Sequence, residues 1–134
     1  MSEDSALSIA RAHLALIKSD PSVAAMVADR VFDFIPRQVP YPFIIYHITN
    51  SDEWDTTREN GEEHAIFIHV YDDYEGPKRA RQIMRRLFEL LHDQTTLTLI
   101  DHNLVNCRRV FYTMDREEQL YHGVSRYRAI TEEL

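Results

Sequence analysis

The seven histidines of this 134-residue chain are the first candidates for chemistry, because a neutral imidazole is a common metal ligand. No two of them have the H-E-x-x-H spacing that places two ligands on one helix face. His47 and His69 fall in segments that we expect to be neighbouring strands, where the two rings could approach each other. His92 falls near the expected end of a helix, where a partly charged imidazole complements the helix dipole. We expect the histidines to be structural or exposed, with no bound metal and no cofactor.

Two other patterns come close to known motifs but miss the required spacing. Ser125 lies in the sequence Gly-Val-Ser-Arg-Tyr (123–127), which lacks the second glycine of a nucleophile elbow. The acidic segment 52–63 has its glycine at the seventh position counted from Asp55, one position too late for a calcium-binding loop. We therefore predict no catalytic residues, and a protein that is not an enzyme.

Cys107 is the only cysteine, which excludes a disulfide within the chain and a zinc site built on several cysteines. It alternates in phase with Val105 and Phe111, and this pattern predicts a small buried residue rather than a reactive thiol. Such sparse cysteine use favours synthesis in a reducing cytoplasm.

A basic run and an acidic loop point to binding rather than to catalysis. The basic run falls on a predicted helix and is either a solvated helix face or a docking surface for an acidic partner. The acidic loop is long for a hairpin connection, and it holds the only tryptophan, which either packs on its own chain or anchors an interface. The candidate interface residues are Lys78, Arg79, Arg81, Arg85 and Arg86 in the basic run, and Asp52, Glu53, Trp54, Asp55, Arg58 and Glu59 in the loop.

The segment 64–93 is the clearest structural unit, with a strand, a turn and a helix in succession. Residues 65–71 have the β-branched and aromatic composition of a strand, and the turn residues of 72–77 stop it. Pro77 suits a first helical turn. From Ala80 the apolar residues recur with helical period, so we expect the helix to cover a sheet with one face and to point its basic face outward.

The remaining segments place helices before this unit and strands on both sides of it. Asp20 and Pro21 are typical of a helix start, as cap and first residue. Asn60-Gly61 is the strongest short turn signal, so we expect it at the tip of a protruding hairpin formed by 50–63. The other expected elements are helices at about 5–18 and 21–28, strands at 43–49, 103–113 and 120–130, a possible short strand at 31–35, a charged turn at 114–119 and an acidic tail at 131–134.

This order of elements predicts an α+β fold. We expect a single domain over residues 1–134, with a roughly four-stranded, mainly antiparallel sheet and two to three helices packed on one face. No apolar run approaches the length of a membrane span, and the acidic N-terminus lacks the features of a signal peptide. The net charge of −7 argues against general affinity for nucleic acid.

The succession of segments resembles the small tail-completion or tail-terminator proteins of long-tailed phages, prophages and gene transfer agents. The resemblance covers about residues 7–132. It departs from the usual pattern at Asp101-His102-Asn103, where a turn containing glycine is expected. The segments that carry it are DPSVAAMVADRVFDFIP (20–36), PYPFIIYH (40–47), HAIFIHVYDDYEG (64–76), RRLFELLHD (85–93) and LVNCRRVFYTMDREEQLYHGVSRYRAITEE (104–133).

The resemblance implies a structural protein without catalysis. Members form a ring, commonly of six copies, at the head-proximal end of the tail tube. The ring ends polymerisation of the tube and offers a surface to the head-tail connector. The implied partners are further copies of the chain, the major tail tube protein and the connector or neck protein, with DNA only passing through the channel. The implied location is the cytoplasm of the bacterial host during assembly, then the neck of the particle, with no membrane contact.

The charged features suit such a ring, because head-to-tail contacts need two different and complementary surfaces. Our hypothesis is that the 50–63 loop contacts a neighbouring subunit or the tail tube, with the basic helix face as a second contact. Charge reversal at Arg85 and Arg86 should then weaken assembly and leave the monomer folded. The alternatives are another neck or head-completion protein of the same particle, or a small nucleic-acid-binding module that uses the basic helix 78–86 and loses affinity steeply with salt.

Overall fold

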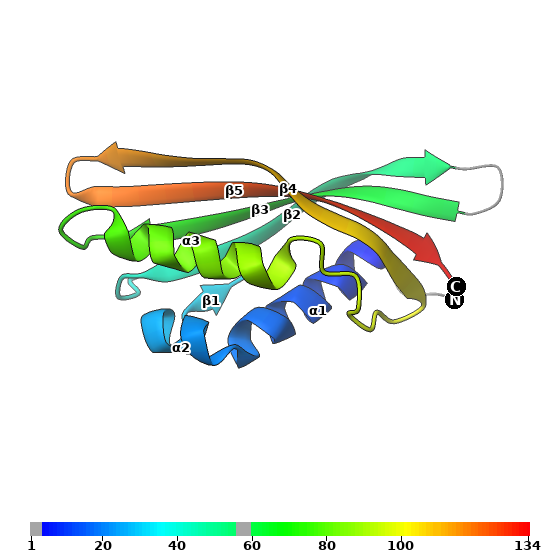
Figure 1. The fold of residues 1–134 in the computed structure, drawn as a ribbon, viewed down its shortest axis with the longest axis horizontal. Coiled ribbons are helices and arrows are strands. Elements are labelled where there is room, and N and C mark those ends of the chain that lie inside the picture. Colours follow the sequence, from blue (N-terminus) through cyan, green and yellow to red (C-terminus); the bar gives the residue numbers. More distant parts are fainter. Residues whose placement is uncertain (1–3, 56–59) are drawn as a thin grey trace.

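A five-stranded sheet with the strand order β1-β2-β3-β5-β4 forms the framework of the molecule (Figure 1). In a computed structural model we describe the backbone of residues 4–55 and 60–134, and the side chains of residues 4–49 and 61–134. β1 pairs with β2 in parallel, and every other neighbouring pair is antiparallel. The elements are α1 (Ser5–Ser19), α2 (Pro21–Val27), β1 (Val31–Phe32), β2 (Phe43–Asp55), β3 (Asn60–Asp72), α3 (Lys78–Leu91), β4 (His102–Glu117) and β5 (Leu120–Glu133).

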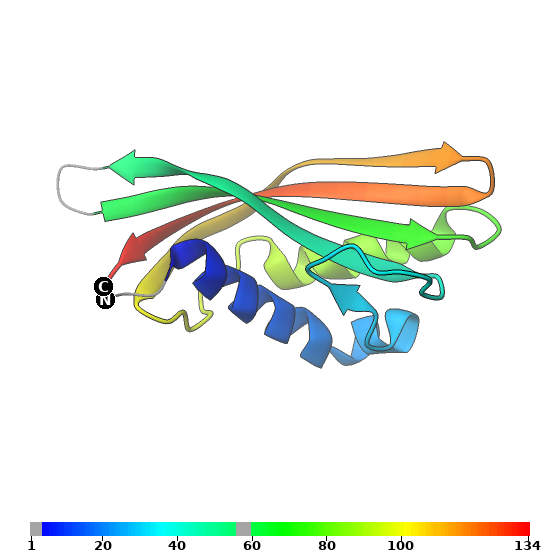
Figure 2. The same ribbon diagram turned by 180° about the vertical axis from the view of Figure 1, so that it is seen from behind.

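The three helices lie on one side of the sheet, and the two views agree on this arrangement (Figures 1 and 2). α3 packs on β3, β4 and β5, whereas α1 reaches β2 and the start of β4. The core lies between the two layers, where the apolar stripe of α3 meets alternate residues of the central strands. Ile83 and Leu87 on α3, and Ile66 and Ile68 on β3, are almost completely buried. The α+β prediction is confirmed, with β1 as the additional short strand.

The helix boundaries follow the capping signals of the sequence closely. The Asp20 carboxylate accepts a hydrogen bond from the backbone N–H of Val23 at 3.0 Å, and Pro21 is the first residue of α2, as predicted. Pro77 precedes α3 as its cap residue instead of lying inside the first turn. This start leaves the carbonyl of Pro77 to accept the first helical hydrogen bond, from the N–H of Arg81 at 2.9 Å.

The predicted protruding hairpin at 50–63 is confirmed, but the predicted position of its tip is wrong. Asn60 pairs with Asp55 and Gly61 pairs with Trp54, so these two residues begin β3 and do not form the tip. The backbone pairing of the two flanking strands therefore continues to Asp55 in β2 and begins at Asn60 in β3. Figure 1 shows the paired strands extending past the N-terminal end of α1 as an arm of the sheet. We call the stretch from Ser51 to His64 the β2–β3 arm.

The β4–β5 hairpin also extends further than expected. The predicted charged turn at 114–119 is wrong in its first part, because β4 continues to Glu117. The predicted tail is wrong as well, because β5 continues to Glu133. The pairing continues because the last residue of each strand has a partner in the other strand: Glu117 of β4 is opposite Leu120 of β5, and Glu133 of β5 is opposite His102 of β4.

Two irregularities in β4 change which side chains are buried. The register with β5 shifts between Leu104 and Asn106 and again between Arg109 and Phe111. Each extra residue breaks the alternation of a strand. Cys107 is completely buried as predicted, yet Phe111, which shares its phase in the sequence, is 57% exposed.

Candidate interaction surfaces

The basic face of α3 divides into two sides with different roles. On one side, Arg79 binds the completely buried carboxylate of Asp72, with Nη2 at 2.5 Å from Oδ1 and Nε at 3.0 Å from Oδ2. About two turns further along, Arg86 binds Asp20 with Nη2 at 2.6 Å from Oδ1 and Nε at 3.0 Å from Oδ2. These two arginines therefore connect α3 to the end of β3 and to the cap of α2, and the outward basic surface is narrower than the sequence predicts.

Electrostatics agree with this structural role. The hydrogen bond from Arg86 lowers the pKa of Asp20, and the backbone N–H of Val23 adds to the effect. In return, the hydrogen bond to Asp20 raises the pKa of Arg86. Each partner therefore favours the charged form of the other, which strengthens the ion pair between α2 and α3.

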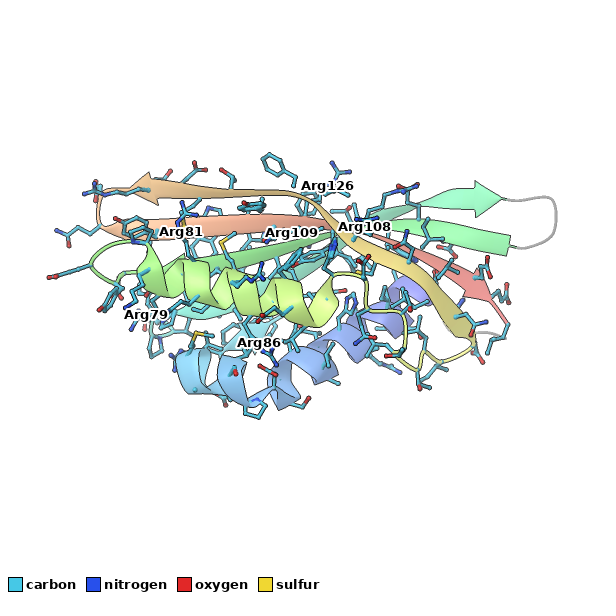
Figure 3. The ribbon with its side chains drawn as sticks, in the orientation of Figure 1. Arg79, Arg81, Arg86, Arg108, Arg109 and Arg126 are labelled. Atoms are coloured by element: carbon cyan, nitrogen blue, oxygen red, sulfur yellow. The ribbon has the colours of Figure 1, made fainter. Side chains whose placement is uncertain are left out.

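The other side of α3 forms a basic groove together with β4. Arg81 and Arg85 of α3 face Arg109 and Tyr112 of β4 across a cavity of about 190 Å³, with Met84 and Met114 completing its lining. Figure 3 shows Arg81 and Arg109 on this side of α3, and Arg79 and Arg86 on the side toward α2. We call this feature the α3–β4 groove.

Arg109 is held in the groove by two aromatic rings. Its guanidinium carbon lies 4.2 Å from the centroid of the Phe88 ring and 3.9 Å from that of Tyr112. These are cation–π contacts, which fix the side chain without neutralising its charge. The guanidinium carbon of Arg85 also lies 5.2 Å from the centroid of the Phe88 ring. Its Nε is 4.0 Å from Oε2 of Glu89, and this exposed ion pair is weak. The groove can therefore bind a carboxylate or another anion.

Sequence reasoning missed Arg109 and Tyr112 as members of this surface. Arg109 follows Arg108 in the chain, and the alternation of β4 decides which of the two faces α3. Arg108 lies opposite Arg128 on the uncovered face, whereas Arg109 lies opposite the buried Tyr127 on the helix face. The phase that predicts a buried Cys107 also places Arg109 on this face, and that signal could have identified it, whereas Tyr112 reaches the same face only through the register shift between Arg109 and Phe111.

The acidic candidates belong to the β2–β3 arm. The backbone of Asp52, Glu53, Trp54 and Asp55 is paired in β2, but their side chains lie outside the described residues. Arg58 and Glu59 lie outside them entirely.

At the base of the arm, Glu63 forms an ion pair with Arg128 of β5. The hydrogen bond from Arg128 lowers the pKa of Glu63. This ion pair therefore connects the base of the arm to β5.

The histidines form a different pair from the one expected. His69 Nδ1 lies 2.9 Å from Nε2 of His122, and the His122 ring stacks on Tyr71 with centroids 4.3 Å apart. His47 shares the uncovered face with His69 but is opposite Phe67 in the neighbouring strand. Burial lowers the pKa of both His69 and His122, and the neighbouring His122 lowers that of His69 further, whereas Asp115 and Glu117 partly offset the effect of burial on the pKa of His122.

No catalytic or metal-binding arrangement is found in the described part of the chain. Residues 4–55 and 60–134 contain no group of three or more histidine, cysteine or carboxylate side chains that could hold a metal ion. Ser125 is buried within β5, and burial raises the pKa of the Cys107 thiol to about 12. None of the helices described is both long and apolar enough to cross a membrane.

Comparisons with known proteins agree with the resemblance noted in the sequence. The family model described as "Tail completion protein gp17" matches residues 11–132. No curated protein gave a match. A chain of a solved structure, "Virion of native gene transfer agent (GTA) particle", has the same fold with a TM-score of 0.81 and 21% sequence identity, over 98% of this chain and 99% of that chain.

A family model that covers nearly the whole chain, together with a matching fold along its full length, assigns the relationship. The implied class is a structural protein of a tail. The chain belongs to the family of tail completion protein gp17.

Proposed function

We propose that this protein closes the head-proximal end of a tail tube as an oligomeric ring, with six copies as the expected number. The ring ends polymerisation of the tube and joins the tail to the head-tail connector. The family supports a role in tail completion. The similar fold in a gene transfer agent virion supports a place in a phage-like particle. Within that particle, the proposed location is the neck between head and tail.

The observation that carries the proposal is the presence of two unlike charged surfaces on one protomer. The α3–β4 groove is lined by three arginines, and the β2–β3 arm is acidic in sequence. In Figure 1 the arm extends from the sheet beyond the N-terminal end of α1, while α3 covers the other half of the sheet. Two different surfaces on one subunit favour head-to-tail contacts, and such contacts give a ring when the rotation closes.

The proposed partners follow from this arrangement. Further copies of the chain occupy the sides of the ring, the major tail tube protein lies below it and the connector or neck protein lies above it. The arm contacts either the neighbouring subunit or the tube, and the basic surface of α3 is the second contact. The net charge of −7 suits a channel through which DNA passes without binding. Assembly takes place in the cytoplasm of the bacterial host, and the protein works as a structural component rather than as an enzyme.

The decisive experiment adds the protein to tail tube protein that is polymerising. We expect shorter tubes, each with a ring at one end in electron micrographs, and tube length that falls as the ratio of this protein to tube protein rises. Light scattering on the protein alone, over a range of concentration and salt, gives the copy number. A hexamer-sized species is the expected result.

Unchanged tube length, with no density added at tube ends, would contradict the capping role. The same sample then tests the neighbouring role of a head-completion protein, through binding to emptied heads instead of tubes. A charge-reversed Arg81→Glu/Arg85→Glu variant should shorten tubes less than the unmodified protein does, because it alters the groove. Its fold should be intact, because Arg79 and Arg86 still bind their buried carboxylates.

A further inference from the structure

β4 is an edge strand with an exposed apolar border. It is the terminal strand of the sheet, and β5 is its only partner strand in the described part of the chain. Val110 and Phe111, near its centre, are 53% and 57% exposed. A long edge strand of this kind is a ready template for another strand, and isolated proteins usually protect it with lysine, proline or a covering segment. β4 contains neither lysine nor proline, and from Phe111 to Glu117 it pairs with β5 without a bulge.

The opposite border of the sheet is also open. β1 pairs with β2 only at Ile44 and Ile45, so that within the described residues no strand covers the outer edge of β2 from Tyr46 onward. The strand directions alternate from β2 through β3 and β5 to β4. A second copy placed beside the first in the same orientation would therefore set its β4 antiparallel to this β2. Antiparallel pairing of two free edges satisfies backbone groups on both strands.

The open edge of β2 borders a groove that fits the border of β4. The groove has a volume of about 280 Å³ and is lined by the first turns of α1 and by residues 46–48. Leu7 is 46% exposed there, and it offers an apolar contact to Val110 or Phe111. Asp4 and Asp33 also line the groove and carry the charge opposite to that of Arg109.

The pairings across the sheet place these two borders at the same level. Ile48 is opposite Ile66, Ile66 is opposite Tyr127, and Tyr127 is opposite Arg109. The stretch 109–112 of β4 therefore lies level with residues 46–48 of β2. Side-by-side subunits need little displacement along the strands to bring the exposed centre of β4 to the groove.

We propose that neighbouring copies join by adding β4 of one subunit to the open edge of β2 in the next, so that the sheets form one continuous antiparallel ring. This inference rests on the proposed function for the existence of a ring, and it specifies the contact that closes it. The contact is head-to-tail, since β4 meets β2 and never another β4. The charged residues Arg109, Asp4 and Asp33 set the register, and Leu7, Val110 and Phe111 supply apolar contact.

Cross-linking between two single-site variants tests this contact directly. Phe111→Cys and His47→Cys are made separately, one of them carrying a mass tag, and the two are mixed and treated with a short bismaleimide. Both positions are exposed, whereas the native Cys107 is completely buried. The unmodified protein, treated in the same way, measures any background cross-linking through Cys107. We expect the mixed product between the two variants, and no product from either variant alone.

A second pair of variants tests the energetics. Val110→Glu and Leu7→Lys should each raise the protein concentration needed for assembly about tenfold, because each opposes a like charge across the contact. The first brings a carboxylate toward Asp4 and Asp33, and the second brings an ammonium group toward Arg109. Tyr74→Lys is the control, since Tyr74 is 47% exposed in the turn before α3 and lies outside both the stretch 109–112 and the groove at β2. We expect assembly of the control to match that of the unmodified protein.

The cross-linking is carried out on the free assembly and on protein bound to tube ends. Rings that form without the mixed product would overturn the edge contact and leave the capping role intact. A product from Phe111→Cys alone would also overturn it, since it would show a two-fold contact between β4 strands. Failure to shorten tubes, with the mixed product present, would instead contradict the proposed function.

Discussion

Arg86 of α3 and Asp20 at the start of α2 form a two-pronged ion pair, although 66 positions separate them in the chain. Asp20 also caps α2 through the N–H of Val23. One carboxylate therefore fixes the start of a short helix and holds it against α3. The seven residues of α2 are too few to be stable alone, so this helix depends on its contacts.

Removing Asp20 should destabilise the fold. Asp20→Ala loses a helix cap and the hydrogen bonds to a charged partner, which together correspond to about 2 to 4 kcal/mol of unfolding free energy. Arg86→Ala should also be destabilising, because it leaves the largely buried Asp20 carboxylate without its partner. Urea unfolding followed by circular dichroism measures both. Arg85→Ala is the control and should change stability little, since that side chain is 68% exposed; a loss equal to that of Asp20→Ala would contradict this account.

Because Arg86 binds Asp20, a test of assembly must use arginines outside this ion pair. Reversal of Arg85 and Arg86 together would damage the fold as well as the surface, so it cannot separate the two effects. Arg81→Glu/Arg85→Glu alters only the α3–β4 groove, and we expect an intact monomer with weaker assembly in light scattering. Arg126→Glu, on the uncovered face of the sheet, is the control for the single reversal Arg81→Glu, because each of these two variants changes one arginine to glutamate (Figure 3). Equal loss of assembly in the control would show that net charge, and not the groove, is responsible.

Acid should destabilise the protein below about pH 6.5. His13 is completely buried with Nδ1 2.8 Å from the Tyr46 hydroxyl, and burial lowers its pKa from 6.5 to about 4. Burial also lowers the pKa of His64, His69 and His122. Because unfolding then takes up protons, stability is complete above the unfolded pKa of 6.5 and is lost as the pH falls toward 4. For His13 alone the shift corresponds to about 3 kcal/mol.

Urea midpoints measured from pH 7.5 to pH 4.5 test this dependence. We expect a steady decrease below pH 6.5 in the unmodified protein and a shallower decrease in His13→Leu, which removes the most strongly shifted group. His47→Gln provides the comparison, since His47 is exposed. The same slope in His13→Leu and in the unmodified protein would show that His13 is not the group that takes up the proton.

Gly123 lies where α3 comes closest to β5. A Cβ atom there would meet Sδ of Met84 and would lie 3.2 Å from Cε of Met114. Gly123→Ala should therefore cost about 1 to 3 kcal/mol through overpacking. Met84→Ala makes room for the added methyl group, so the double variant should be more stable than the sum of the two single effects predicts. Strict additivity in urea unfolding would contradict the close approach.

The sequence predicts the elements of this fold better than it predicts their contacts. The apolar period of α3 and the Asp20-Pro21 start of α2 are local signals, and both are confirmed. The ends of β2 and β5 are wrong in the prediction, because polar segments such as 131–133 enter a ladder only when a partner strand lies beside them. Strand length in this sheet is therefore a property of the pairing rather than of local composition.

For the candidate surface, too, the sequence predicts the composition but not the contacts. The basic composition of α3 can be read directly, yet nothing local separates Arg79 and Arg86, which bind buried carboxylates, from Arg81 and Arg85. Arg109 shares the face of the buried Cys107 by simple alternation, whereas the contribution of Tyr112 depends on a bulge that has no clear sequence signal. The interface role of the arm and of the groove remains a prediction for the assembly experiments.

The position of β5 has a consequence for folding. β5 lies between β3 and β4, yet it follows every other described element along the chain, and Gly61 is opposite Glu132. Until β5 pairs, β4 has no partner strand among the described elements and β3, which pairs with β2, has one open edge. The β3–β5 pairing must close long loops before it gains its contacts, so this non-local step should limit the rate at which the sheet forms. Until then, the edges of β3 and β4 are open to strands of other chains.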